Sequence, residues 1–195
     1  MNLTNKQTDE ILPTIFTKRH ARITGIVYLL YFLTTILAET LRGSKLGIYS
    51  NAINLISFAF YIAVTILFFY MFKPVNSLIS LIAALCSLAG CAIGALSVFY
   101  PALLNISPLV FFAPYCLLIG YLILRSTFLP RILGVLMILA GVGWLAFLSP
   151  LGKYLSLYFE ILGIVAEGSL MLWLIVKGIS VGQGKEQAEA SRIKS

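Results

Sequence analysis

Three glutamates are the residues whose type and position in this sequence could do chemistry. Glu39, Glu160 and Glu167 are the only acidic residues between positions 23 and 176, and each lies in or beside a long apolar run. A carboxylate in an apolar setting is costly unless it is neutral or partnered, so it marks a candidate proton path or polar-ligand site. Glu167 is ten residues from Lys177, which puts it roughly 15 Å from one end of a helix, near a bilayer midplane.

The other two glutamates have different expected depths. Glu160 is seven residues from Glu167, almost two helical turns, so both are expected on one face of the same helix. For Glu160 and Glu167 the alternative to a functional role is a structural hydrogen bond or ion pair to a neighbouring helix. For Glu39 the alternative is an ion pair with Arg42 or Lys45 at the membrane surface.

Polar residues elsewhere could complete a site around these carboxylates. Asn51, Asn54 and Ser57 recur every three residues at the same expected depth as Glu39 and Glu160, and Arg42 follows Glu39 closely. We therefore predict a polar pocket that opens outward between the 23–41, 51–71 and 155–176 segments. The alternative for Asn51 is that it only caps its helix.

The remaining residue inventory argues against several other membrane chemistries. His20 is the only histidine and Asp9 the only aspartate, so a bis-histidine haem, a two-histidine zinc site and an aspartate dyad are excluded. Cys86, Cys91 and Cys116 contain no Cys-x-x-Cys spacing and are interpreted as buried apolar thiols rather than metal or redox residues. No metal site and no cofactor is expected.

The elements that must position these residues follow from composition. Hydrophobic residues make up 60% of the 195 positions and charged residues only 11%, less than half the roughly 25% typical of soluble domains. This excludes a soluble enzyme and a nucleic-acid-binding protein. The apolar runs are continuous rather than alternating, which indicates helices and not barrel strands. We predict an all-α bundle of six transmembrane helices at about 23–41, 51–71, 78–100, 108–124, 131–149 and 155–176.

Basic residues set the expected orientation. If the N-terminus is inside and the chain crosses six times, eleven Lys and Arg lie on the cytoplasmic side. Three lie outside: Arg42, Lys45 and Lys153. Both termini are therefore expected in the cytoplasm, with tails at 1–20 and 179–195 around a membrane domain at 21–178. Arg22, Arg125 and Arg131 are candidates for lipid or phosphate contacts, and the alternative is that they only set topology.

Small and aromatic residues give packing expectations. Gly90 and Gly94 form a small-x-x-x-small pattern, which indicates a close helix contact within the chain or, as an alternative, between two copies. Trp144, Trp173 and Tyr28 are expected in aromatic belts near the ends of their spans. The lipid bilayer is the expected partner, together with a small-molecule or proton ligand.

Several segments resemble a known family. They include Phe128-Leu129-Pro130-Arg131-Ile132-Leu133-Gly134, followed by Ala140-Gly141-Val142-Gly143-Trp144, and then Glu167 before Leu172-Trp173-Leu174. Over about residues 20–178 the chain resembles the bacterial integral-membrane family catalogued as domain of unknown function 4386. Its matching polar positions are Arg22, Glu39, Arg131 and Glu167. The resemblance implies a compact, multi-pass protein of a bacterial cytoplasmic membrane and supplies no activity.

Three functions are compatible with these features. The first is a small-molecule or proton-linked transporter with an intramembrane carboxylate site, although no inverted repeat is visible. The second is a non-catalytic sensory, lipid-binding or accessory subunit. The third is a membrane enzyme with a glutamate as general acid or base.

Overall fold

The structure is a computed structural model that describes residues 18–100, 106–150 and 152–179. Within these ranges all regular structure is helical, which confirms the predicted all-α class. The predicted tails at 1–20 and 179–195 lie almost entirely outside the described residues. Helix bounds agree with the predicted runs to within a few residues. The helices are α2 Lys18–Arg42, α3 Gly47–Phe72, α4 Ser77–Phe99, α5 Leu109–Arg125, α6 Arg131–Phe147 and α7 Gly152–Val176.

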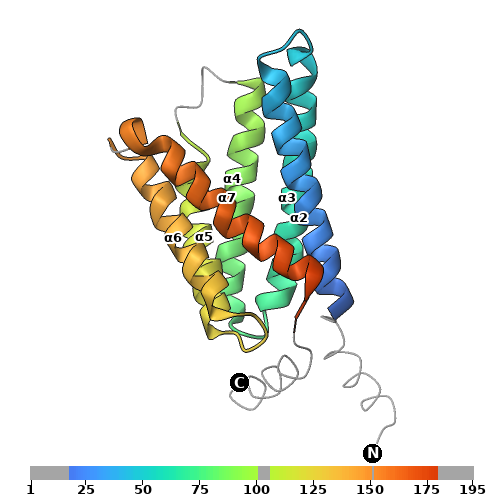
Figure 1. Ribbon diagram of the computed structural model, residues 1–195, viewed down its shortest axis with the longest axis vertical. Helices are drawn as coiled ribbons and strands as arrows, with labels where there is room; N and C mark the ends of the chain where they lie inside the picture. The colour runs from blue at the N-terminus through green and yellow to red at the C-terminus, as the bar shows by residue number, and fades with distance from the viewer. Residues whose placement is uncertain (1–17, 101–105, 151, 180–195) are drawn as a thin grey trace, which may run out of the picture.

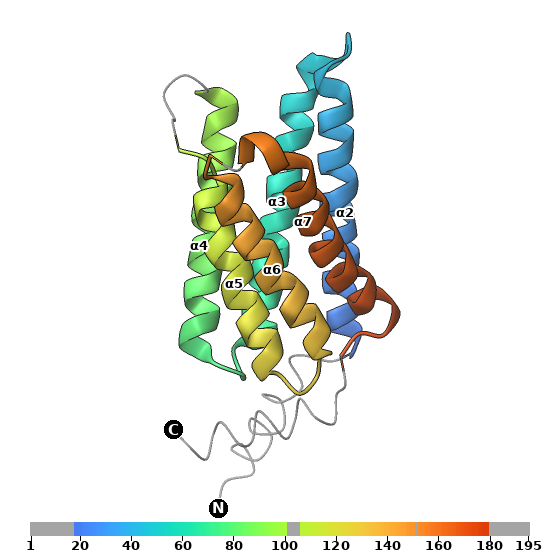
Figure 2. The ribbon, with the colours of Figure 1, turned by 60° about the vertical axis from the view of Figure 1, so that its left-hand side comes forward.

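The six helices form a closed ring. Each helix packs mainly against the next along the chain, and α7 returns to pack against α2. Short connections such as 43–46 and 73–76 force successive helices to run antiparallel. As a result, α2 begins and α7 ends at the same end of the bundle (Figures 1 and 2).

Length and surface composition indicate a membrane protein. Three whole helices, α2, α3 and α4, and the Tyr154–Val176 part of α7 are long and apolar enough to cross a membrane, whereas α5 and α6 are shorter apolar helices. Large apolar side chains cover the outside of the bundle, with Ile36 60% and Leu78 67% exposed. An apolar outer surface of this extent is unfavourable in water and favourable in lipid.

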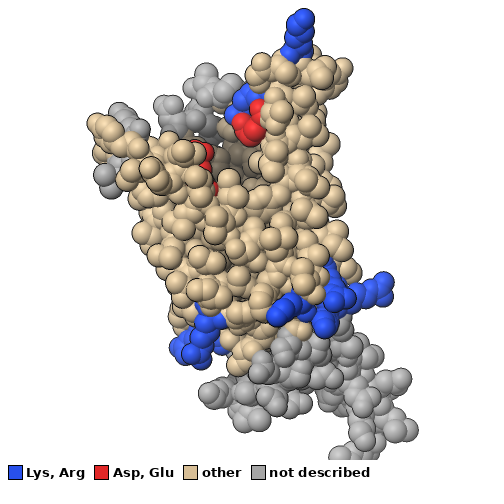
Figure 3. Space-filling view, viewed as in Figure 1, with Lys and Arg blue, Asp and Glu red and all other residues tan. Residues whose placement is uncertain are grey.

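The described charges separate toward the two ends. The basic side chains at the end where α2 begins are Lys18, Arg19, Arg22, Lys73, Arg125, Arg131 and Lys177, whereas Arg42 and Lys45 lie near the other end. On the face in Figure 3 a band without Lys or Arg separates the two groups. We refer to these as the basic end and the opposite end.

Aromatic side chains fill the bundle toward the basic end. Tyr28, Phe68 and Phe72 are almost fully buried. Ring centroids lie 5.9 Å apart for Tyr28–Phe68, for Phe68–Phe72 and for Phe72–Phe128. This row of packed aromatic side chains gives the basic half of the helix bundle a closed core.

Gly90 and Gly94 are buried inside this chain. A Cβ on Gly90 would lie 3.1 Å from the Phe112 ring of α5, and one on Gly94 would overlap the Phe58 ring of α3. The small-x-x-x-small pattern therefore serves close packing within the bundle. An additional contact between two copies stays a prediction.

The contact between α2 and α7 sets the position of the site. A Cβ on Gly25 would lie only 2.8 Å from the backbone nitrogen of Ile175, so the two helices approach closely near the basic end. Arg22 also donates a hydrogen bond to the carbonyl of Val176 (3.4 Å). From this contact α7 runs obliquely across the bundle and away from α2 (Figure 1). The seam between the first and last described helices thus opens toward the opposite end.

Candidate functional site

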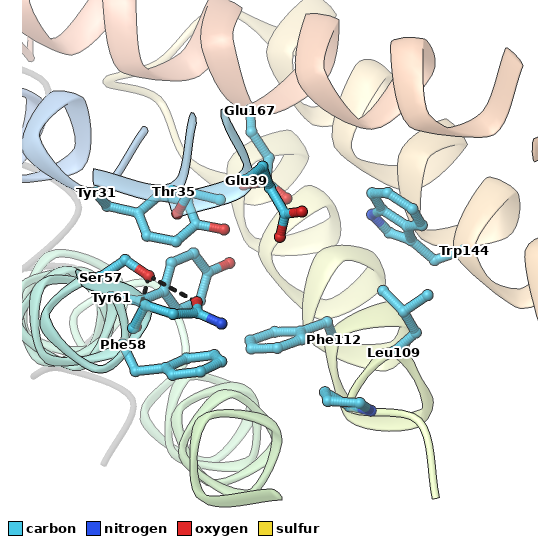
Figure 4. Close-up of a pocket in the computed structure, with 12 residues that line it drawn as sticks. Tyr31, Thr35, Glu39, Ser57, Phe58, Tyr61, Leu109, Phe112, Trp144 and Glu167 are labelled. Carbon is cyan, nitrogen blue, oxygen red and sulfur yellow. Dashed lines mark hydrogen bonds between the residues drawn. The ribbon is translucent and has the colours of Figure 1, made fainter. Parts of the chain in front are cut away.

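A pocket of about 310 Å³ occupies the place where this seam opens. Five of the six helices contribute to its wall, and α4 does not. Acidic side chains gather around a hollow at this end of the molecule (Figure 3). The lining residues, most of them labelled in Figure 4, are Tyr31, Thr35, Glu39, Asn54, Ser57, Phe58, Tyr61, Pro108, Leu109, Phe112, Trp144 and Glu167.

Glu167 contributes the deepest carboxylate. Its side chain is half-buried and lines the pocket. The hydroxyl of Tyr28, a fully buried residue of α2, donates a hydrogen bond to Glu167 Oε2 at 2.7 Å. This bond spans the α2–α7 seam and gives the carboxylate a neutral partner. Glu167 therefore forms the structural link between helices that was considered for it, and it also lines the pocket, where a functional role stays a prediction.

Glu39 forms the ion pair that was considered for it and also lines the pocket, where a functional role stays a prediction. It lines the pocket from α2, and Figure 4 shows its carboxylate directed into the space between the aromatic rings. Glu39 Oε1 also lies 3.0 Å from Arg42 Nη2, in an ion pair whose side chains are more than half exposed. Exposed pairs of this kind contribute little stability, so the ion pair leaves Glu39 available to the pocket.

The polar residues of α2 and α3 join the pocket in part. Asn54 and Ser57 line it, and Ser57 Oγ donates to the Asn54 carbonyl at 2.8 Å and lies 3.3 Å from Asn54 Oδ1. Thr35 lines it too, and its Oγ1 is buried with no hydrogen-bond partner among the described residues.

Asn51 is exposed and outside the lining. Each residue of a helix is rotated by about 100° from the one before it. Asn51 and Ser57 are six residues apart, so their side chains point in directions about 120° apart around α3. The capping interpretation of Asn51 is also wrong, because α3 begins at Gly47 and Leu46 occupies the N-cap.

Two further predicted residues do not line the pocket. Glu160 is exposed and, although it is on the same helical face as Glu167, it lies two turns nearer the opposite end. There α7 has already separated from α2, so this face no longer meets a facing helix (Figure 1). Arg42 contacts Glu39 but is absent from the lining.

Five of the twelve lining residues are aromatic, and this aromatic wall was not predicted. The centroids of Tyr31 and Tyr61 lie 4.6 Å apart, and those of Tyr61 and Phe112 lie 5.2 Å apart with the rings nearly perpendicular. Figure 4 shows Trp144 across the cavity from the two tyrosines. In sequence, Tyr28, Tyr31 and Thr35 follow the three-and-four spacing of one helical face leading to Glu39, and this pattern could have identified the part of the wall that α2 contributes.

Two of the aromatic-belt predictions are wrong. Tyr28 is fully buried at the bond to Glu167 rather than at the membrane surface. Trp144 lines the pocket and packs where a side chain on Gly163 would stand. The missing side chain at Gly163 lets the indole fit between α6 and α7, so the tryptophan turns inward.

The basic candidates lie away from the pocket. Arg125 Nε donates to the hydroxyl of Tyr121 at 3.0 Å, and its guanidinium lies 5.6 Å from the centroid of that ring. Arg22 bonds Val176, and Arg131 is exposed at the start of α6. All three belong to the basic end, so a lipid or phosphate role for them stays a prediction separate from this pocket.

Among the described residues, no group of three or more His, Cys, Asp or Glu could hold a metal ion. Cys91 and Cys116 are buried free thiols and Cys86 is half-buried. What the pocket does offer is two carboxylates, an amide, two aliphatic hydroxyls, two phenolic hydroxyls and a set of aromatic rings. This set can bind a polar or charged small molecule, and a carboxylate can accept and release a proton.

Comparison with known families gives one match. Residues 100–178 match the family described as domain of unknown function (DUF4386). The match confirms the resemblance over these residues. It covers α5, α6 and α7, and therefore Phe112, Trp144 and Glu167 of the pocket. Comparisons with curated proteins and with solved structures give no match.

Proposed function

We propose that this chain is a six-span protein of a bacterial cytoplasmic membrane that binds a small molecule at Glu167 and couples its movement to a proton. The observation that carries the proposal is the pocket of about 310 Å³ that reaches this carboxylate inside the helix ring. A bundle filled solidly around Glu167 would have left it only a structural role.

The six spans are supported by helix length and by charge. The two short helices, α5 and α6, have 17 residues each, about 26 Å of rise, which is at the lower limit for crossing a bilayer. Seven described Lys and Arg lie at the basic end and two near the opposite end. The positive-inside rule then places the basic end in the cytoplasm and the pocket mouth on the outer side.

Proton coupling is supported by the surroundings of Glu167. The carboxylate lies within an apolar ring of helices, its hydrogen-bond partner is the neutral Tyr28, and it has no ion pair among the described residues. A carboxyl group in this setting can change protonation state as a ligand enters or leaves. Neutralisation of Glu167 would lower the cost of moving it through the membrane interior.

A second candidate, a binding or sensory subunit without transport, is favoured by the closed core. Between Glu167 and the basic end, the interior is filled by the buried rings of Tyr28, Phe68, Phe72 and Phe128. Transport would require these rings to move apart, whereas binding alone would not.

Proton flux into proteoliposomes distinguishes the two candidates. A pH-sensitive dye is enclosed in the vesicles, and an inside-negative potential is imposed with potassium and valinomycin. A mixture of small organic cations, zwitterions and neutral solutes is supplied outside, because coupled transport moves protons only with a ligand. We expect the intact chain to acidify the lumen faster than empty vesicles, and Glu167→Gln to return the rate to the empty-vesicle level. Glu160→Gln is the matched control, because it removes an exposed carboxylate of the same helix outside the pocket, and it should retain the flux. Equal rates for intact protein and empty vesicles would exclude the transporter.

A further inference from the structure

We infer that the pocket takes an organic cation, an ammonium group with apolar substituents held between the aromatic wall and the carboxylates of Glu39 and Glu167. This inference rests on the proposed function in one respect, namely that the pocket binds a small molecule. It adds the chemical class of that molecule.

The charge of the lining is the first argument. Two of the twelve lining residues are glutamates, and none is Lys, Arg or His. Arg42 offsets part of the Glu39 charge, but its side chain is exposed to solvent and is not part of the lining. An anion would meet two carboxylates and no basic side chain among the described lining residues. A cation would gain a favourable interaction that low polarity strengthens.

The aromatic wall is the second argument. Five of the twelve lining residues are aromatic: Tyr31, Phe58, Tyr61, Phe112 and Trp144. The face of an aromatic ring attracts a cation, and cages of such rings are the usual way in which proteins hold quaternary ammonium groups. The edge-to-face arrangement of Tyr61 with Phe112 at 5.2 Å turns ring faces in different directions, so that more than one face is offered to the cavity.

The size and donor set separate an organic cation from a bare metal ion. The volume of about 310 Å³ is at the lower end of the roughly 300–1,000 Å³ of small-molecule sites. A hard cation such as Ca²⁺ needs a compact shell of about six to eight oxygens, whereas five of the twelve lining residues here are aromatic and only two are carboxylates. A neutral apolar ligand would fit the rings but would leave both carboxylates without a favourable partner.

Paired probes of equal shape test the charge. Choline and its uncharged carbon isostere, 3,3-dimethylbutan-1-ol, are titrated calorimetrically into the full chain in lipid nanodiscs, together with benzyltrimethylammonium. We expect both cations to bind at least about tenfold more tightly than the alcohol. Glu167→Gln should weaken cation binding by about tenfold or more, and Glu160→Gln should leave it unchanged.

A second variant covers the case in which Glu167→Gln is poorly folded. Phe112→Leu removes a ring face and retains an apolar side chain, and it should weaken benzyltrimethylammonium binding while leaving the alcohol unaffected. In a Trp173→Phe background, fluorescence reports Trp144 in the pocket wall, and the cations should change it.

The outcomes separate this inference from the proposed function. Equal affinity for choline and the alcohol, unchanged in Glu167→Gln, would overturn the organic-cation inference and leave a small-molecule pocket. Absence of cation binding to folded protein would also overturn the inference, while the proton-flux measurement would still decide transport.

Discussion

The two ends of the helix ring are built from the same six helices and differ in how α2 and α7 meet. At the basic end the two backbones touch at Gly25 and Ile175, and packed aromatic rings fill the interior. At the opposite end the same two helices have separated, and a pocket with two carboxylates takes the place of the core. The tilt of one helix therefore produces both a closed end and an open one.

This difference shows why a carboxylate can be kept inside the bundle. Glu167 lies where closed core changes to open pocket, with its Oε2 bonded to the buried Tyr28. Deeper in the core the group would lack a route to water or ligand, and nearer the opposite end it would be exposed, as Glu160 is. At this position Glu167 has a hydrogen-bond partner, Tyr28, on the side of the basic end and a cavity on the side of the opposite end.

The largest expected effect comes from breaking the closed end. Gly25→Ala would bring a methyl group within 2.8 Å of the Ile175 backbone, and such overpacking should destabilise the protein by about 3 kcal/mol. SDS-induced unfolding followed by circular dichroism measures the change. Gly168→Ala in α7 is the matched control, since a Cβ there meets nothing within 4 Å, and it should be neutral or stabilising. Equal losses in both variants would contradict the close α2–α7 contact.

The next effect concerns the boundary between the two ends. Tyr28→Phe removes the donor to Glu167 Oε2 and should cost about 2 kcal/mol, because a partly buried carboxyl loses its partner. A double-mutant cycle with Glu167→Gln, measured by the same unfolding assay, should show coupling between the two positions. Strictly additive losses would mean that the bond does not contribute.

A smaller effect is expected where the chain leaves α7 at the basic end. Gly178 has a φ of +67°, and its N–H bonds the carbonyl of Trp173 at 3.1 Å. Gly178→Ala should cost about 1 kcal/mol, since a residue with a Cβ is strained in this conformation. The proton flux and cation affinity of this variant should be unchanged, which separates helix termination from the pocket. A loss of flux with normal stability would argue against that separation.

The smallest effect tests a seam that does not open. Thr65 Oγ1 of α3 and Ser87 Oγ of α4 are buried and 2.6 Å apart. Interhelical hydrogen bonds of this type contribute about 0.6 kcal/mol on average in membranes, so Thr65→Val should lower unfolding stability by about that amount. Choline affinity should stay the same, and a large drop would show that the pocket depends on the α3–α4 seam as well.

Much of the fold was predictable, because the apolar runs were about as long as a bilayer is thick and charges separated them. Glu39 and Asn54 were predicted for an outward pocket and do line it, as does Glu167, which was predicted as a deeper proton or polar-ligand site. Glu160, Arg42 and Asn51 were predicted for the same outward pocket and do not line it. The depth of the residues that line it followed from position along a helix, which a sequence contains.

The aromatic wall could not be predicted in the same way. Phe112 and Trp144 come from α5 and α6, and their contribution depends on helix neighbours and on the tilt of α7. Such relations arise from packing at many contacts, including the absent side chain at Gly163. The aromatic-belt prediction failed at Tyr28 because nearness to a span end does not decide which way a side chain faces, and the helical face that Tyr28 shares with Tyr31 and Thr35 turns into the bundle.

The closure of the ring by α2 and α7 has a consequence for biosynthesis. Synthesis proceeds from the N-terminus, so the Tyr28 hydroxyl enters the membrane five helices before the carboxylate that it will bond. Until α7 inserts, the surface of α2 around Gly25 lacks the helix against which it packs. The pocket can therefore be completed only after α7 has been inserted, and a chain stopped after α6 has an open ring and no Glu167.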